Sequence, residues 1–258
     1  MVLSKNNLSS KKYSAIISLV PSQTELLFYL GLEKEVIGIT KFCIHPDAWF
    51  KEKTRVGGTK NINLETIDQL SPDLIIANKE ENSKEQIEKL AVTYDIWITD
   101  VKNLPEAIEM IRDIGNLTNR TEAAFDLALK IESGFIELKN IFSKKRRIQS
   151  AYFIWKDPYM VAANDTFIND MMKYCGLENI YSNLDRYPQI TLKEISDKKC
   201  ELILLSSEPF PFGQKHKEEI QNQLPGTKIV LVDGEMFSWY GNRLLKSISY
   251  FRRFSENL

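Results

Sequence analysis

The sequence predicts an α/β protein of two lobes, each built on a mostly parallel sheet, with one long helix between them. Short apolar runs alternate with helical patterns in both halves of the 258-residue chain, which is typical of βαβ units. Between the halves, apolar residues repeat at spacings of four and three over residues 120–142. This stripe predicts a helix of roughly 35 Å, a length suited to a strut that joins two lobes.

Each half supplies its own set of strands and helices. Gly31 closes the first predicted helical segment, at the position where a left-handed residue ends many helices. Ser83 and Gln86 have the spacing of a capping box. The expected strands are residues 15–20, 36–39, 74–77, 96–99, 151–155, 201–206 and 228–232, and the expected helices are residues 22–31, 64–70, 83–91, 104–114, 120–142, 166–175, 192–197, 215–223 and 241–254. The predicted domains are an N-terminal lobe at 13–118, a connecting helix at 119–143 and a C-terminal lobe at 148–258.

Composition narrows the class of protein. The formal net charge is −1, and no basic face is evident, so a nucleic-acid partner is not expected. The first 12 residues are polar, and the apolar run that a secretory signal needs is missing, which predicts a cytoplasmic protein if Met1 is the native start. A different native N-terminus would make a periplasmic or surface-anchored protein the expectation. No stretch is long enough to insert into a membrane.

The motifs favour binding over catalysis. No nucleotide-binding loop, nucleophile elbow or zinc-protease helix is present. Three cysteines lie far apart without zinc spacing, and two histidines exclude a three-histidine metal site within one chain. We therefore expect no metal site and no covalent cofactor. An enzyme that uses Cys43 or a carboxylate in the cleft remains the least favoured alternative.

Aromatic and polar residues gather directly after the predicted strands of both halves. Ligands of open α/β sheets bind outside the carboxyl ends of strands, so a cleft between the lobes is the expected site. An aromatic lining with a few polar groups suits a large organic ligand, although packing in the core is the alternative role for each aromatic side chain. The candidate ligand-binding residues are Phe42, Cys43, His45, Trp155, Phe210, Glu235, Trp239 and Tyr240.

Two glutamates occupy similar local sequences. Glu25 ends Ser22-Gln23-Thr24-Glu25, and Glu194 ends Thr191-Leu192-Lys193-Glu194. Each pattern predicts a capping box in which the glutamate bonds the backbone at its own helix start. The alternative is a matched pair of exposed charges, one at the tip of each lobe.

Several motifs resemble those of the cobalamin and iron-chelate substrate-binding proteins of ABC transporters, the helical-backbone metal receptors. The resemblance covers most of the chain, and its motifs are specific to the superfamily rather than to one ligand. They are IISLVPSQTE at 16–25, RVGG at 55–58, NLE at 63–65, LSPDLIIA at 70–77, CGLENI at 175–180 and YPQIT at 187–191.

The resemblance implies two Rossmann-like lobes joined by a backbone helix, the class III periplasmic-binding-protein fold. It implies a corrinoid, heme or ferric chelate as ligand, with Tyr187 as an aromatic residue of the cleft. It also implies that Glu25 and Glu194 dock on arginines of an ABC permease. The loops at 42–46, 208–212 and 233–240 depart from the cobalamin receptor, which indicates a ligand of a different subgroup.

These observations predict a solute-binding protein that holds a corrinoid or metal-chelate ligand and serves ABC-type uptake. A cytosolic carrier or sensor with the same fold and no transporter is the alternative.

Overall fold

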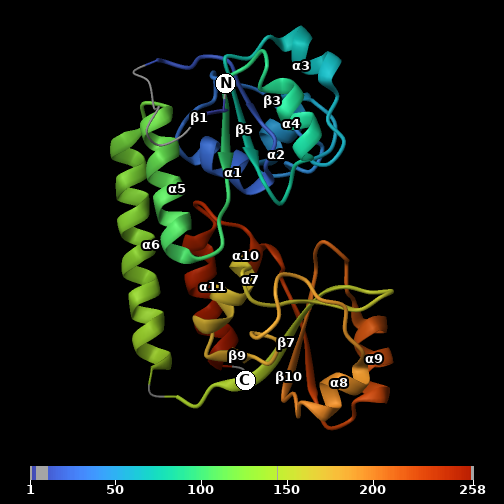
Figure 1. Ribbon diagram of the computed structural model, residues 1–258. Coiled ribbons are helices and arrows are strands. Elements are labelled where there is room, and N and C mark those ends of the chain that lie inside the picture. Colours follow the sequence, from blue (N-terminus) through green and yellow to red (C-terminus); the bar gives the residue numbers. More distant parts are fainter. Residues whose placement is uncertain (1, 4–10, 144, 257–258) are drawn as a thin grey trace. The chain divides into compact units, whose positions relative to one another are not determined.

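The computed structural model describes residues 2–3, 11–143 and 145–256, and the chain forms two compact units. Both units have α/β architecture, as predicted (Figure 1). The boundaries differ from the expected lobes, because the long helix is shared between the units and a short C-terminal segment belongs to the first. Unit 1 comprises Met1–Val101, Pro105–Ile131 and Trp239–Arg243, and unit 2 comprises Lys102–Leu104, Glu132–Ser238 and Leu244–Leu258.

The sheet of unit 1 is parallel throughout, with strand order β1-β6-β5-β2-β3-β4. β2 lies inside the sheet, and residues 16–20 of the apolar run that predicted it are buried. The strands are β1 (Val2–Leu3), β2 (Ile16–Ser18), β3 (Val36–Ile39), β4 (Thr54–Arg55), β5 (Leu74–Asn78) and β6 (Ile96–Thr99). The helices are α1 (Pro21–Tyr29), α2 (Asp47–Glu52), α3 (Leu64–Leu70), α4 (Lys84–Leu90) and α5 (Leu104–Leu117).

The helix starts in unit 1 use different devices from those that the sequence suggested. α1 begins with Pro21 at its first position and has no side-chain cap, so the predicted capping box at Glu25 is wrong. The predicted box at Ser83 is also wrong, because Gln86 bonds the backbone of Ile62 instead. α3 has a true cap, in which the side chain of Asn63 accepts a hydrogen bond from the next turn.

The sheet of unit 2 is mostly parallel, with β10 between β11 and β7. β7 is long enough for two partners on its other side: β9 pairs with its first half in parallel, and β8 pairs with its second half antiparallel. The strands are β7 (Ile148–Trp155), β8 (Met160–Ala162), β9 (Leu177–Asn179), β10 (Leu202–Ser206) and β11 (Lys228–Val232). The helices are α7 (Phe167–Lys173), α8 (Leu192–Asp197), α9 (Gln214–Gln223), α10 (Glu235–Ser238) and α11 (Leu244–Glu256).

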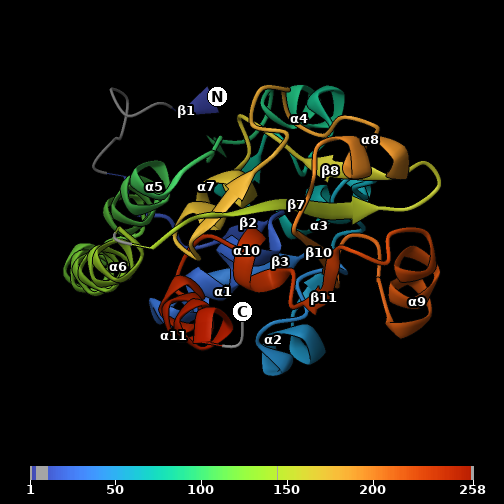
Figure 2. The ribbon, with the colours of Figure 1, turned by 90° about the horizontal axis from the view of Figure 1, so that it is seen from below.

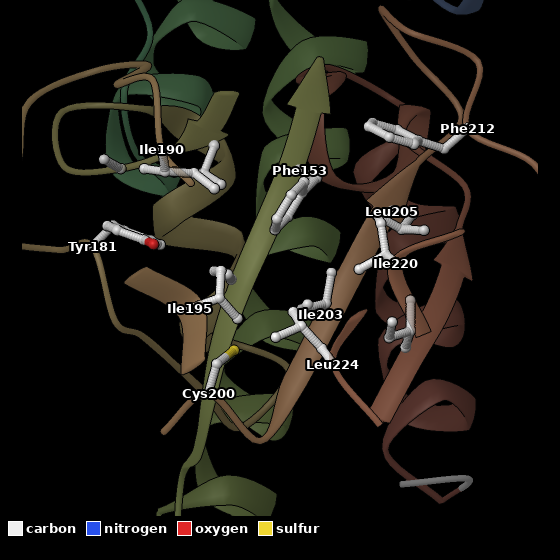
Figure 3. Packing of buried hydrophobic residues seen from close by; sticks show 14 residues of the cluster. Phe153, Tyr181, Ile190, Ile195, Cys200, Ile203, Leu205, Phe212, Ile220 and Leu224 are labelled. Carbon is white, nitrogen blue, oxygen red and sulfur yellow. The ribbon is translucent and has the colours of Figure 1, made fainter. Parts of the chain in front are cut away.

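One hydrophobic cluster fills the face of the unit 2 sheet that α8 and α9 cover. Figure 3 shows Phe153 of β7 and Leu205 of β10, which pack together with side chains from α8 and α9. Phe153 is fully buried, and its ring meets Tyr159 and Phe212 edge-on, with centroids 5.5 and 6.4 Å apart. Burial of these side chains stabilises the sheet edge from which the candidate ligand residues extend.

The long helix α6 (Thr121–Phe142) forms as predicted and contributes residues to both units. Its predicted apolar stripe is buried. Within unit 1, α5 runs beside it (Figures 1 and 2), and Gly115 permits this approach, because an added Cβ would lie 2.2 Å from that of Ala124. Within unit 2, Gly134 serves α11 in the same way, since an added Cβ would lie 2.4 Å from Ile248.

An exposed ion pair ties the segment before β7 to the strand beside it. Both terminal nitrogens of Arg146 bond the carboxylate of Glu201, at 2.9 and 2.7 Å, and the N–H of Gln149 bonds it at 3.0 Å. These hydrogen bonds favour the charged form, chiefly those from Arg146, and lower the pKa of Glu201 to about 2.

We predict that Arg146→Gln raises the pKa of Glu201 toward the ordinary value of about 4.3, because the bond from Gln149 alone remains. Carbon-detected NMR titration of the carboxyl group measures this change. A depressed pKa means that the pair stabilises the fold above the unfolded pKa and loses this effect as the pH falls toward 2. A Glu201 pKa unaffected by the substitution would contradict this assignment.

Candidate functional site

In unit 1, the loop after β3 presents apolar side chains to solvent. Phe42 is 51% exposed and Ile44 is 46% exposed, while His45 is partly buried. Exposed apolar groups at the carboxyl end of a parallel strand are typical of ligand contacts. Ile44 was not among the predicted site residues, because nothing in its local pattern separates an exposed isoleucine from a core residue.

Cys43 does not share this exposure. Its side chain is fully buried, and Sγ lies 3.1 Å from the hydroxyl oxygens of both Thr24 and Thr40. Burial raises the pKa of the Cys43 thiol, which is the opposite of what an activated nucleophile requires. In the free protein Cys43 therefore offers no surface to a ligand, its ligand contact stays a prediction, and an enzyme built on this thiol is not supported.

The turn after β5 adds a carboxylate that the predicted site did not include. Asn78 Oδ1 accepts hydrogen bonds from the N–H groups of Glu80 and Glu81, at 2.8 and 3.1 Å. Asn82 fixes the other end of the turn, since its amide donates to the carbonyl oxygens of Leu19 and Thr59. Partial burial raises the pKa of Glu81. The structure thus holds one desolvated carboxylate at the carboxyl end of β5.

Trp239 and Tyr240 lie in unit 1, although they follow strands of the second half in sequence. Trp239 is only 7% exposed, and its ring meets His45 edge-on, with centroids 5.5 Å apart. Tyr240 is buried and bonds Gln23 and Ser22, and this burial raises the pKa of its hydroxyl. Neither ring offers a ligand much surface in the free protein, and the role of both residues in ligand binding stays a prediction.

In unit 2, Trp155 at the carboxyl end of β7 is the most exposed of the predicted aromatic residues. It is 41% exposed, and its ring meets that of the half-buried Phe210 edge-on, at 5.7 Å. Phe210 in turn contacts Phe212 and His216, at 4.8 and 5.2 Å. The structure therefore brings Trp155 and Phe210 together, and the contacts of Phe210 with Phe212 and His216 hold Phe210 in place beside Trp155.

The two remaining predicted ligand residues of unit 2 are partly buried. Tyr187 lies in the segment after β9, where the guanidinium of Arg186 lies 5.7 Å from its ring centroid. Glu235 opens α10, and its N–H bonds the carboxylate of Asp233 at 3.1 Å. A neighbouring carboxylate was not predicted: Glu208 accepts a hydrogen bond from the hydroxyl of Ser238 at 2.6 Å.

The two glutamates proposed for docking differ in their surroundings. Glu194 is exposed and forms the predicted capping box with Thr191, whose hydrogen bonds lower the pKa of Glu194. Glu25 is buried, and its carboxylate pairs with Arg243 at 2.7 Å. Glu25 is therefore not an exposed charge at a lobe tip.

Sheet topology identifies a better match for Glu194. α8 precedes β10, which pairs in parallel with β7, and α3 precedes β5, which pairs in parallel with β2. α3 also begins with a side-chain cap and carries the exposed Glu65 in its first turn. Glu65 and Glu194 thus occupy equivalent helices, whereas Glu25 lies on α1. The NLE motif was the sequence signal for Glu65.

Two kinds of feature are absent from the described residues: a metal-ion cluster and a membrane-spanning helix. Within residues 2–3, 11–143 and 145–256, no three His, Cys, Asp or Glu side chains are grouped to hold a metal ion. No helix in the same ranges is long and apolar enough to cross a membrane.

Comparison with known proteins gives similar relatives. The chain is 24% identical over 208 residues to a vitamin B12-binding protein of Vibrio vulnificus strain CMCP6, covering 80% of this chain and 76% of that one. It is 26% identical over 234 residues to a vitamin B12-binding protein of Pectobacterium carotovorum, covering 89% and 84%.

Solved structures share the fold. The periplasmic vitamin B12-binding protein of Vibrio cholerae matches with a TM-score of 0.80 at 20% identity, over 95% of this chain and 97% of that one. A periplasmic heme-binding protein of Pseudomonas aeruginosa matches with a TM-score of 0.81 at 16% identity, over 95% and 93%. These periplasmic relatives lend no support to the cytoplasmic location that the N-terminal residues suggested.

Residues 16–228 match the family described as periplasmic binding protein, which is well over half of the chain. The match begins at β2 and ends at the start of β11, so it covers strands of both units, while Glu235, Trp239 and Tyr240 lie after its end. The resemblance noted in the sequence is confirmed: this chain belongs to the periplasmic binding protein family.

Proposed function

We propose that this protein is a solute-binding protein whose ligand is a corrinoid, and that it delivers this ligand to an ABC-type permease. The observation that carries the proposal is the family match together with relatives that are named as vitamin B12-binding proteins. The exposed apolar side chains at the strand ends support it, because a large macrocycle needs such surface.

The charges at the strand ends favour a corrinoid over heme. Corrin side chains are largely neutral amides that donate hydrogen bonds, whereas heme carries two anionic propionates. Two lysines near these strand ends are already paired, Lys79 with Asp100 and Lys156 with Glu219. The carboxylates that follow the strands accept amide hydrogen bonds but repel propionates; they are Glu80, Glu81, Asp157, Glu208 and Glu235.

Parallel titrations of the purified protein with cyanocobalamin, hemin and a ferric siderophore test the proposal. We expect saturable binding of cyanocobalamin and weaker binding of hemin. Glu81→Gln tests whether the negative charge disfavours hemin. It keeps the acceptor oxygen but removes the charge, so the difference in affinity between cyanocobalamin and hemin should become smaller. Tight binding of hemin without binding of cyanocobalamin would reject the corrinoid assignment.

Docking on a permease supplies a second test. We propose that Glu65 and Glu194 are the docking charges, since they are exposed and lie on equivalent helices. The double variant Glu65→Gln with Glu194→Gln should lose salt-sensitive association with membrane vesicles from the native host, while cyanocobalamin affinity stays the same. Gln at 194 still closes the capping box, so stability should be unchanged.

Glu122→Gln is the control for that experiment, because Glu122 is also an exposed glutamate in the first turn of a helix, α6. It should leave association intact. If the double variant associates as well as the wild-type protein, these glutamates do not dock, and the cytosolic carrier or sensor becomes the favoured interpretation.

A further inference from the structure

The segment Trp239–Arg243 belongs to unit 1, whereas α10 before it and α11 after it belong to unit 2. Gly241 allows the segment to lie close to α1. Its φ of +124° is a conformation that side chains disfavour, and an added Cβ would lie 3.3 Å from the carbonyl oxygen of Ser22 and 3.4 Å from Cβ of Leu26.

A buried ion pair fastens this segment to α1. Arg243 Nε donates to Glu25 Oε2 at 2.7 Å, and the two side chains are 5% and 9% exposed. Removing two charges from water is costly, and apolar residues of similar volume often serve stability equally well. Stability alone therefore gives no strong reason for an ion pair at this position.

A series of side-chain contacts connects the ion pair to the exposed loop of unit 1. The guanidinium of Arg243 lies over the ring of Trp239, 4.7 Å from its centroid. The Trp239 ring also contacts His45, whose imidazole meets it edge-on with centroids 5.5 Å apart and an angle of 70° between the ring planes. His45 is partly exposed and follows Phe42 and Ile44, the apolar side chains at the carboxyl end of β3.

We propose that Glu25 and Arg243 are positioning residues for ligand binding: they hold Trp239, and through it the imidazole of His45, at the ligand-binding end of β3. The effect on ligand affinity rests on the proposed function, whereas the effect on His45 is a property of the ligand-free protein. This role also accounts for Glu25, for which the family resemblance had implied docking on a permease.

NMR of the imidazole groups reads the position of His45 directly. The chain has two histidines, so His216 of unit 2 is an internal control in every spectrum. In Glu25→Gln, we expect the ring resonances of His45 to move, because Arg243 loses its anionic partner and the Trp239 ring shifts beside the imidazole. The His216 resonances should stay in place.

A second variant separates positioning from folding. Glu25→Leu with Arg243→Met removes both charges, so no unpaired buried charge remains, and thermal stability should stay close to that of the wild-type protein. The guanidinium that lies over the Trp239 ring is nevertheless removed. We expect the His45 resonances to remain shifted and cyanocobalamin affinity to fall roughly tenfold, the scale of coupling between residues in contact.

Two outcomes overturn the proposal, and a third shows that the corrinoid assignment fails independently of it. Wild-type His45 resonances in both variants overturn it, whether or not cyanocobalamin binds. Shifted resonances with unchanged affinity also overturn it, because the ligand then does not depend on the position of His45. If the wild-type protein does not bind cyanocobalamin, the corrinoid assignment fails, and the resonances alone decide whether the pair holds His45.

Discussion

Phe153→Ala should lower the free energy of unfolding by about 3–5 kcal/mol, the largest change in stability that we predict for a single core substitution. Phe153 is fully buried on β7, and its ring contacts those of Tyr159 and Phe212. Removing the ring loses this burial and leaves a cavity that flanking strands cannot close, because β8, β9 and β10 all pair with β7.

Urea unfolding followed by circular dichroism measures the change. Phe210→Ala is the matched control, because Phe210 packs against the same cluster but is only half-buried. We expect it to cost less than about 2 kcal/mol. Equal losses for the two variants would contradict the assignment of Phe153 to the centre of the unit 2 core.

Trp155→Ala should weaken cyanocobalamin binding by about 1–3 kcal/mol, the value of burying one large apolar side chain against a ligand. Trp155 has the exposed ring that such a contact needs, and Phe210 supports its edge. Stability should change by less than about 1 kcal/mol, because Trp155 is already 41% exposed to solvent in the free protein.

Isothermal titration calorimetry with cyanocobalamin tests this effect. Trp155→Phe should recover part of the affinity, since it restores an aromatic surface at the same strand end. Normal binding by Trp155→Ala would place the ligand away from β7, and poor folding of the variant would make Trp155 a core residue.

Periodicity predicted most of the regular elements, because apolar spacing is set by which face of a helix or strand is buried. The strands at 36–39 and 228–232 and the helices at 64–70 and 192–197 have the predicted bounds. Several short elements were missed, among them β4, α10 and the six-residue α2. They are too short to show a period, and long-range pairing or packing decides them.

Local sequence did not predict which glutamate closes a capping box, because the same pattern is compatible with another helix start and with a distant partner. Ser22-Gln23-Thr24-Glu25 and Thr191-Leu192-Lys193-Glu194 have the same spacing, yet only Glu194 closes a box. Pro21 starts the first helix one position before Ser22, and Arg243 takes the carboxylate of Glu25. The partner lies 218 residues away, so no local pattern predicts it.

Exposure separates the residues that were predicted to bind the ligand. Trp155 and Phe42, which follow strand ends, are exposed. Cys43, Trp239 and Tyr240 are buried, because hydrogen bonds and ring contacts from α1 and the β3 loop enclose them. Whether an aromatic residue after a strand faces solvent depends on such contacts, which sequence periodicity does not encode.

Native mass spectrometry of the protein purified from its own host can identify the bound ligand directly. We expect a complex heavier than the 29.9 kDa chain by the mass of one corrinoid, which is lost on unfolding because no covalent bond holds it. Cyanocobalamin added to the apoprotein should restore a complex of one ligand per chain. A protein that carries heme or a ferric siderophore from the host and does not take up cyanocobalamin would contradict the corrinoid assignment.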